Sequence, residues 1–370
     1  MKLFSCKSCG HTLYFHNVEC TQCGHRLGFI PDTLDLVAFD IADNCDWQPV
    51  TPAGETRTFR PCANYTEHNA CNWMVPAADT NPLCLACRLN RTIPDLSVTG
   101  NKMLWQRLQT EKNRLIYSLL RLRLRLRLAM VSKAESAKHG LAFDFLGDPN
   151  PRFQEDSSVM TGHAAGLITL DIAEADDAVR EKIRRDMAEP YRTILGHLRH
   201  ESGHFYWDRL VRDSHWLADF RERFGDERSD YDAALQQHYA AGPPPDWSNR
   251  YVSAYATSHP WEDWAETWAH YLHMIDTLET AWQFGLRLAP RVGRDEDLAS
   301  KVTFDPFACK DFQTLADCWF PLTVALNSLN RSMGQADAYP FVLTPSMLGK
   351  LQLVHTIIRD QATPAGESCV

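Results

Sequence analysis

The spacing of apolar residues predicts mixed secondary structure in which helices dominate. From residue 101 onward, leucines recur at helical spacing, at Leu104, Leu108, Leu115 and Leu119. Two shorter apolar runs, residues 141–146 and 166–172, are typical of strands. Acidic residues at 174–177 then suit the start of a helix. The remaining chain has a mostly helical pattern, which breaks at the Gly-Pro-Pro-Pro run of residues 242–245.

Residues 120–128 alternate strictly between leucine and arginine, and this pattern is ambiguous. Strict alternation slightly favours a half-buried strand, although both residue types also form helices well. A solvated basic face explains the arginines as well as a functional role does.

The composition is that of a chain with a sizeable core, because 44% of its 370 residues are hydrophobic and 11 are tryptophan. This length predicts two domains, or one large domain with an appendage. The formal net charge of −9 disfavours a dedicated nucleic-acid binder, whose surface is usually basic. No apolar run suits a signal peptide or a membrane span, so we expect a soluble, cytoplasmic protein without a membrane partner.

Cysteines are concentrated near the start of the chain, where nine of the twelve precede residue 90. Six of these nine form Cys-x-x-Cys pairs, which in a reducing compartment indicate metal sites rather than disulfides. Two matching pairs predict a tetrahedral structural zinc site, held by Cys6, Cys9, Cys20 and Cys23. A glycine follows each pair and lets the backbone turn tightly. This is the pattern of a zinc ribbon.

A second cysteine group has less regular spacing and comprises Cys62, Cys71, Cys84 and Cys87. We predict a second structural zinc there, because metal binding supplies folding energy that so short a segment lacks. His68 is the first choice as a substitute ligand, and Cys45 is the cysteine expected to take no part.

The segment His200-Glu201-Ser202-Gly203-His204 has the His-Glu-x-x-His arrangement of a catalytic zinc site. Residues four apart on a helix share a face, so His200 and His204 can bind one ion. Glu201 would then act as the general base that deprotonates a zinc-bound water. An apolar stripe supports a helix here, with Pro190 a candidate for its first turn.

A catalytic zinc needs a third protein ligand, for which the downstream helix offers Glu262 and Glu266. Spacing alone leaves open which carboxylate binds the metal and which orients a ligating histidine. His270 and His273 are less favoured ligands. Three apolar residues four apart on another face of this helix predict core packing: Trp264, Trp268 and Leu272.

The Pro-x-Glu-x-aromatic-Ala-Glu-x-aromatic run that follows the His-Glu-x-x-His helix resembles the gluzincin metallopeptidases, a group that includes anthrax lethal factor and the Mlc titration factor peptidase. This resemblance implies that Glu262 is the zinc ligand and that Glu266 supports a ligand. It also implies that Tyr255, seven residues before Glu262, donates to the developing oxyanion.

More broadly, residues 3 to 350 resemble bacterial zinc-binding metallopeptidases that carry an N-terminal zinc-ribbon domain. The marks of this resemblance are residues 84–95, 200–208 and 261–270. The resemblance implies peptidase activity more firmly than it implies a particular substrate.

We therefore expect an α+β protein, with a zinc-ribbon-type domain over residues 1–95 and a mostly helical, zincin-like metallopeptidase domain with a small β-sheet over 96–362. Residues 363–370 are expected to form a flexible tail. The strand at 166–172 is a candidate edge for pairing with an extended peptide.

The expected function is hydrolysis of peptide bonds in a peptide or protein substrate, with one catalytic and one or two structural zinc ions. Two alternatives remain: a non-catalytic zinc scaffold that binds a protein or nucleic acid, and a zinc amidohydrolase with a non-peptide substrate. A protein partner bound through the zinc ribbon is compatible with the scaffold hypothesis, and nucleic acid is the less expected partner.

Overall fold

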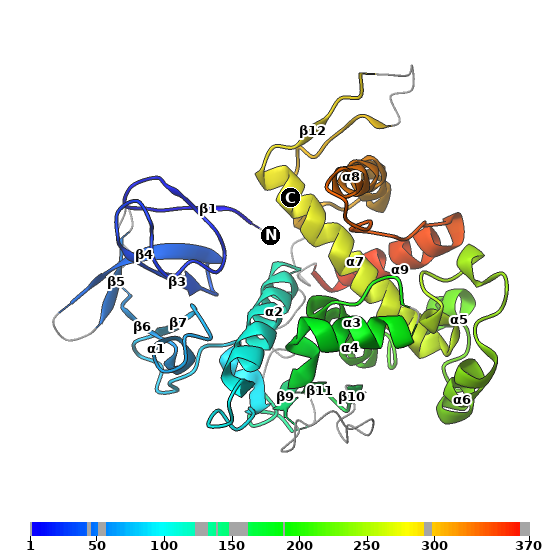
Figure 1. The fold of residues 1–370 in the computed structure, drawn as a ribbon, viewed down its shortest axis with the longest axis horizontal. Helices are drawn as coiled ribbons and strands as arrows, with labels where there is room; N and C mark the ends of the chain where they lie inside the picture. The colour runs from blue at the N-terminus through cyan, green and yellow to red at the C-terminus, as the bar shows by residue number, and fades with distance from the viewer. Residues whose placement is uncertain are drawn as a thin grey trace. The chain divides into compact units, whose positions relative to one another are not determined.

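The computed structural model divides into two compact units, Met1–Ile183 and Arg184–Val370 (Figure 1). It describes residues 2–42, 46–50, 57–122, 132–137, 140–147, 162–187, 189–291 and 298–362. Cys45, most of the Leu/Arg alternation and the expected C-terminal tail lie outside these ranges.

The first unit opens with a small hairpin and a five-stranded antiparallel sheet. Strands β1 (Phe4–Ser5) and β2 (Thr12–Leu13) pair with each other. The larger sheet has the order β3 (Arg26–Ile30), β4 (Asp35–Ile41), β5 (Trp47–Pro49), β6 (Phe59–Pro61) and β7 (Met74–Pro76). Its core is formed by the buried side chains of Ile30, Val37, Phe39, Phe59 and Met74. The short helices α1 (Ala63–Thr66) and η1 (Cys87–Leu89) complete this part.

A second sheet in the same unit has the order β10 (Gly162–Ala164), β11 (Leu167–Asp171), β9 (Ala142–Leu146) and β8 (Asn90–Thr92). The two strands predicted at 141–146 and 166–172 are thus confirmed. The expectation that the second of them is an edge is wrong, because β11 pairs with β10 on one side and with β9 on the other. The edge strands are β10 and β8, and β10 is only three residues long.

Helix α2 (Asn101–Arg121) confirms the predicted leucine-rich helix. Leu108, Leu115 and Leu119 are fully buried along it. The preference for a strand is wrong at the start of the Leu/Arg alternation, because Leu120 and Arg121 form the last turn of α2. Residues 123–128 lie outside the described ranges.

The second unit is built from helices, and α3 (Asp177–Asp186) leads into it from the first. They are α4 (Ile194–Leu210), α5 (Leu217–Phe224), α6 (Tyr231–Ala241), α7 (Pro260–Gln283), α8 (Phe312–Ser332) and α9 (Pro345–Ala362). Shorter elements are η4 (Tyr255–Thr257) and the two-stranded sheet of β12 (Arg287–Leu288) and β13 (Ser300–Lys301). Helix α7 contacts α4, α5, α8 and α9. The expected α+β class is confirmed.

Among the described helices, none combines the length with the apolar character needed to cross a bilayer.

The predicted core residues Trp264, Trp268 and Leu272 are all fully buried on α7, which confirms the prediction of core packing.

The two helices that position the candidate active site begin at clear capping residues. The Thr193 hydroxyl accepts a hydrogen bond from the Gly196 amide at 3.0 Å, so α4 begins at Ile194 rather than near Pro190. At the start of α7, the His259 imidazole accepts from the Trp261 amide at 3.1 Å, and Pro260 takes the first helical position.

Helices α4 and α7 pack closely against each other at Gly203. A Cβ atom on this residue would lie 2.9 Å from Ala265 Cα and 3.2 Å from Trp268 Cβ. The two tryptophans of α7 also donate across the contact, Trp264 to the Gly203 carbonyl at 2.9 Å and Trp268 to the Ser202 hydroxyl at 3.1 Å. The glycine therefore sets the separation of the two helices.

Gly203→Ala should lower the free energy of unfolding by about 1–3 kcal/mol, because the added methyl group overpacks a backbone contact that cannot move aside. Denaturant unfolding measures this change. Gly349→Ala is the matched control on α9, since its Cβ would meet only the flexible end of Arg223. Equal stability of the two variants would show that α4 and α7 do not depend on the glycine.

Candidate metal centres and active site

The first cysteine group, which we call the outer cysteine group, comprises Cys6, Cys9, Cys20 and Cys23. Its sulfur atoms lie 3.7 Å apart in the pairs Cys6–Cys23 and Cys9–Cys20. Four sulfurs at about 2.3 Å from a tetrahedral zinc stand about 3.8 Å apart, so this spacing fits the ion.

The glycines that follow the two Cys-x-x-Cys pairs have a left-handed backbone conformation, in line with the tight turns expected from the sequence. Gly10 and Gly24 have φ angles of 77° and 76°. Their amides donate to the Cys6 and Cys20 carbonyls, each at 2.8 Å, which closes the two turns. Both turns can therefore present two sulfurs to one point.

The second group, which we call the inner cysteine group, comprises Cys62, Cys71, Cys84 and Cys87, all of them buried. Cys71 and Cys84 have their sulfurs 3.7 Å apart, again the spacing of a tetrahedral zinc thiolate site. His68, the expected substitute ligand, is not a member of this group. Its ring packs edge-on against Trp105, with the centroids 5.7 Å apart.

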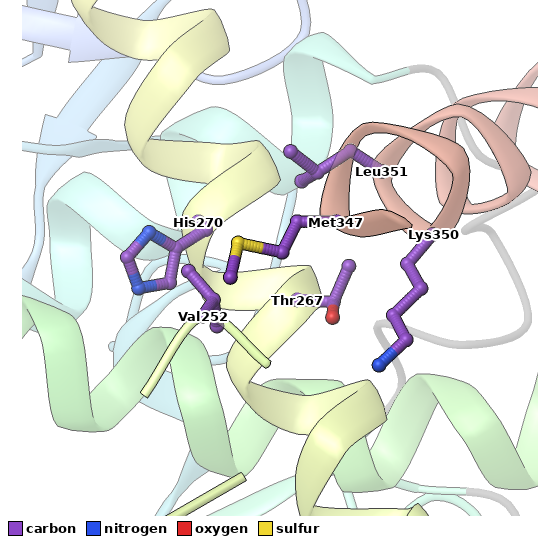
Figure 2. Close-up of a pocket in the computed structure, with 6 residues that line it drawn as sticks. All are labelled: Val252, Thr267, His270, Met347, Lys350 and Leu351. Carbon is purple, nitrogen blue, oxygen red and sulfur yellow. The ribbon is translucent and has the colours of Figure 1, made fainter. Parts of the chain in front are cut away.

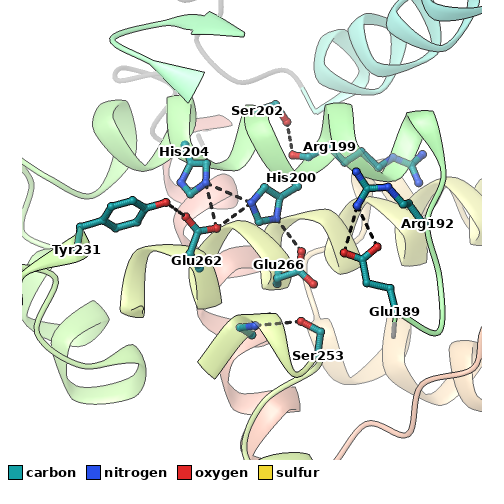
Figure 3. A network of polar contacts seen from close by, with 11 residues as sticks. Glu189, Arg192, Arg199, His200, Ser202, His204, Tyr231, Ser253, Glu262 and Glu266 are labelled. Carbon is teal, nitrogen blue, oxygen red and sulfur yellow. Dashed lines mark hydrogen bonds and ion pairs between the residues drawn. The ribbon is translucent and has the colours of Figure 1, made fainter. Parts of the chain in front are cut away.

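The third group joins two helices of the second unit. Figure 3 shows His200 and His204 of α4 facing Glu262 of α7. The ligand atoms form a triangle, with His200 Nε2 2.9 Å from Glu262 Oε2, His204 Nε2 3.4 Å from the same oxygen, and the two nitrogens 3.2 Å apart. Nitrogen and oxygen ligands at about 2.0–2.1 Å from a tetrahedral zinc stand about 3.3 Å apart. The triangle therefore has the size that zinc requires.

Two further side chains hold these ligand atoms in place (Figure 3). Glu266, one turn after Glu262, lies with Oε1 2.7 Å from His200 Nδ1, so the imidazole directs Nε2 towards the triangle. The Tyr231 hydroxyl donates to Glu262 Oε1 at 2.6 Å, which leaves Oε2 facing the histidines. Sequence reasoning did not identify Tyr231, because it precedes Glu262 by 31 residues and belongs to no motif.

The electrostatics of the triangle favour a cation. Burial alone would lower the pKa of His200, but its contacts with Glu262 and Glu266 raise it well above the usual range. Burial likewise opposes ionisation of Glu266, yet its hydrogen bond to His200 lowers its pKa to about 2. The imidazoles also hold the pKa of buried Glu262 well below its usual range, against the effect of desolvation. Both carboxylates are therefore ionised at neutral pH.

Glu201 and Tyr255 lie beside this triangle. Glu201 is buried, with 7% of the residue exposed, and within the described part of the chain its carboxylate takes part in no hydrogen bond or ion pair. The Tyr255 ring lies 5.9 Å from that of His200, measured between centroids. Burial, reinforced by the Glu262 charge, raises the pKa of Tyr255 well above its usual range, so its hydroxyl remains a donor.

His270 and His273 do not join the triangle. His270 lines a small pocket between α7 and α9, together with Val252, Thr267, Met347, Lys350 and Leu351 (Figure 2). Its Nδ1 shares a hydrogen bond with the Tyr339 hydroxyl at 2.7 Å. His273 Nδ1 lies 2.6 Å from the Arg199 guanidinium. These contacts give both histidines a structural role within the helical unit.

Glu262→Ala should abolish zinc binding at the triangle, whereas Glu266→Ala should weaken it by only about 10- to 100-fold, as expected when a partner of a ligand is lost. The two substitutions are matched, since both remove a carboxylate from one face of α7. Competition of each variant against a zinc chelator measures the affinity. Loss of zinc from Glu266→Ala together with retention by Glu262→Ala would reverse the assignment.

Comparison with known proteins supports zinc binding and a zinc-ribbon domain in general. Residues 101–357 match the family model described as "Putative zinc-binding metallo-peptidase", and residues 3–98 match a zinc-ribbon domain. Uncharacterized proteins of Mycobacterium bovis and of two Mycobacterium tuberculosis strains are 42% identical over 368 residues, which cover 98% of this chain and 97% of each relative. No solved structure matches the chain. The chain belongs to this family of zinc-binding metallopeptidases, with a zinc-ribbon domain ahead of the metallopeptidase segment.

Proposed function

We propose that this protein is a zinc-dependent metallopeptidase that hydrolyses peptide bonds in a peptide or protein substrate. The observation that supports this best is the triangle of His200, His204 and Glu262. Beside it lies the Glu201 carboxylate, which has no hydrogen-bond or ion-pair partner in the described part of the chain. Three protein ligands leave one tetrahedral position for water or substrate, which is the pattern of catalytic rather than structural zinc sites.

When bound, zinc supplies a Lewis acid that lowers the pKa of water and polarises a carbonyl group. Glu201 accepts the proton of the attacking water and returns it to the leaving amine. A general base must be free to take a proton, and the absence of a hydrogen-bond partner for Glu201 among the described residues suits that task. A site that only held a metal would not require this carboxylate.

The two tyrosines near the site have different tasks in this proposal. Tyr255 donates to the carbonyl oxygen of the substrate as that oxygen gains negative charge, the kind of contact whose loss costs about 3–4 kcal/mol. Tyr231 instead holds the Glu262 carboxylate through the 2.6 Å hydrogen bond described above. One acts on the reaction, and the other acts on a ligand.

Glu201→Gln should keep its zinc and lose peptide hydrolysis, because the amide is nearly isosteric but cannot accept the proton. Cleavage of casein or a mixed peptide library, with and without chelator, measures the activity. Glu222→Gln, an exposed position on α5, is the matched control. Chelator-sensitive cleavage at the wild-type rate by Glu201→Gln would exclude this residue as the base. No cleavage by zinc-loaded wild-type protein would favour a scaffold or a non-peptide substrate.

The paired variants Tyr255→Phe and Tyr231→Phe separate the two tasks. Tyr255→Phe should lower kcat with little change in KM or zinc affinity, since its contact forms in the transition state. Tyr231→Phe should weaken zinc binding by about 10- to 100-fold, because Glu262 loses its hydrogen bond. Steady-state kinetics at saturating zinc measure kcat and KM, and chelator competition measures the zinc affinity. Identical behaviour of the two variants would contradict this division.

A further inference from the structure

The inner cysteine group poses an electrostatic problem that the outer group does not. Four thiolates around one divalent zinc leave two net negative charges. All four inner cysteines are buried, with at most 7% exposure, whereas Cys9 of the outer group is exposed to solvent. Buried charge is costly unless it is paired and hydrogen-bonded. Compensation must therefore come from neighbouring protein groups.

One face of α2 provides hydrogen-bond donors to these sulfurs. Gln109 Nε2 donates to Cys87 Sγ at 3.5 Å, and Asn113 Nδ2 donates to Cys71 Sγ at 3.8 Å. The two amides also bond to each other, from Gln109 Nε2 to Asn113 Oδ1 at 2.8 Å, which fixes their orientation. They lie four residues apart and so share a face of the helix.

Between them on the same face lies Lys112, whose side chain is fully buried. Its ammonium donates to the Ala86 carbonyl, between two cysteines of the inner group, at 2.8 Å and also to the Asn90 side chain. Burial lowers the pKa of the Lys112 ammonium, and the charges of the four sulfurs, Cys87 first among them, act against this lowering. Across the described residues, no carboxylate lies within ion-pair distance of Lys112. The inner sulfurs are its anionic neighbours.

We propose that α2 neutralises the inner zinc site, with Lys112 as the counter-charge and with Gln109 and Asn113 as donors to the sulfurs. The match to the metallopeptidase family begins at residue 101, where α2 begins. Zinc at the inner group then stabilises the packing of α2, the first helix of the metallopeptidase match, against the zinc-ribbon match that supplies the cysteines. This role does not depend on whether the protein cleaves peptides.

Lys112→Met in the full-length protein tests the proposal, because it keeps the length of the side chain and removes the charge. It should weaken zinc binding at the inner group by about 10- to 100-fold and leave the outer group unchanged. Chelator competition measures the affinity, and NMR of the cadmium-substituted protein gives a separate signal for each tetrathiolate site. Lys102→Met, at an exposed position of the same helix, is the matched control.

Gln109→Glu is a second test, since it adds a negative charge beside Cys87, and Met103→Glu adds the same charge at an exposed position of α2. Inner-site affinities equal to those of the controls in both variants would overturn the proposal. If a variant does not fold, it is refolded across a zinc titration. Recovery of the fold at high zinc supports the proposal, whereas a variant that stays unfolded at every zinc concentration contradicts it.

Discussion

The close packing of α4 against α7 is the contact on which the candidate active site depends. Both histidines of the triangle come from α4, and Glu262 with its neighbour Glu266 comes from α7. The ligand atoms lie within 3.4 Å of one another, and Gly203 lets the two helices pack closely beside them, because a Cβ atom there would lie 2.9 Å from Ala265 Cα. The tryptophans that donate to Gly203 and Ser202, with the buried Arg199–Asp276 ion pair, fix the register of the two helices.

The three metal groups differ in ways that match different tasks. Each of the two cysteine groups is closed by four sulfurs, which suits a structural ion that contributes folding energy. Among the described residues, the triangle offers three ligands, and it is accompanied by two groups proposed to act on a substrate, Glu201 and Tyr255. The two cysteine groups belong to the first unit and the triangle to the second, so the proposed structural and catalytic metal sites lie in separate units.

Much of the site could be predicted from sequence because its motifs are local. Cys-x-x-Cys turns and histidines four apart on a helix bring ligands together through backbone geometry alone. Spacing left open which of the two carboxylates binds the metal. The resemblance to gluzincins added the expectation that Glu262 binds it and that Glu266 orients a ligating histidine.

Features that depend on tertiary structure were missed or wrongly predicted. Tyr231 reaches Glu262 from α6, a contact that no spacing encodes. Strand β11 is not an edge because the three-residue β10 pairs with it, and so short a strand has little pattern of its own. Lys112 appears in the sequence as one more cation on a basic helix, and only its burial beside the inner sulfurs gives it a role.

Anomalous diffraction at the zinc edge, from crystals of the zinc-loaded protein, tests the central claim most directly. We expect a zinc peak bonded to His200 Nε2, His204 Nε2 and Glu262 Oε2, with Glu266 bonded to His200 and not to the metal. Peaks at the outer and inner cysteine groups would serve as internal evidence that the crystal is loaded. Strong peaks at those groups with none between α4 and α7, or a metal bound by Glu266 in place of Glu262, would contradict it.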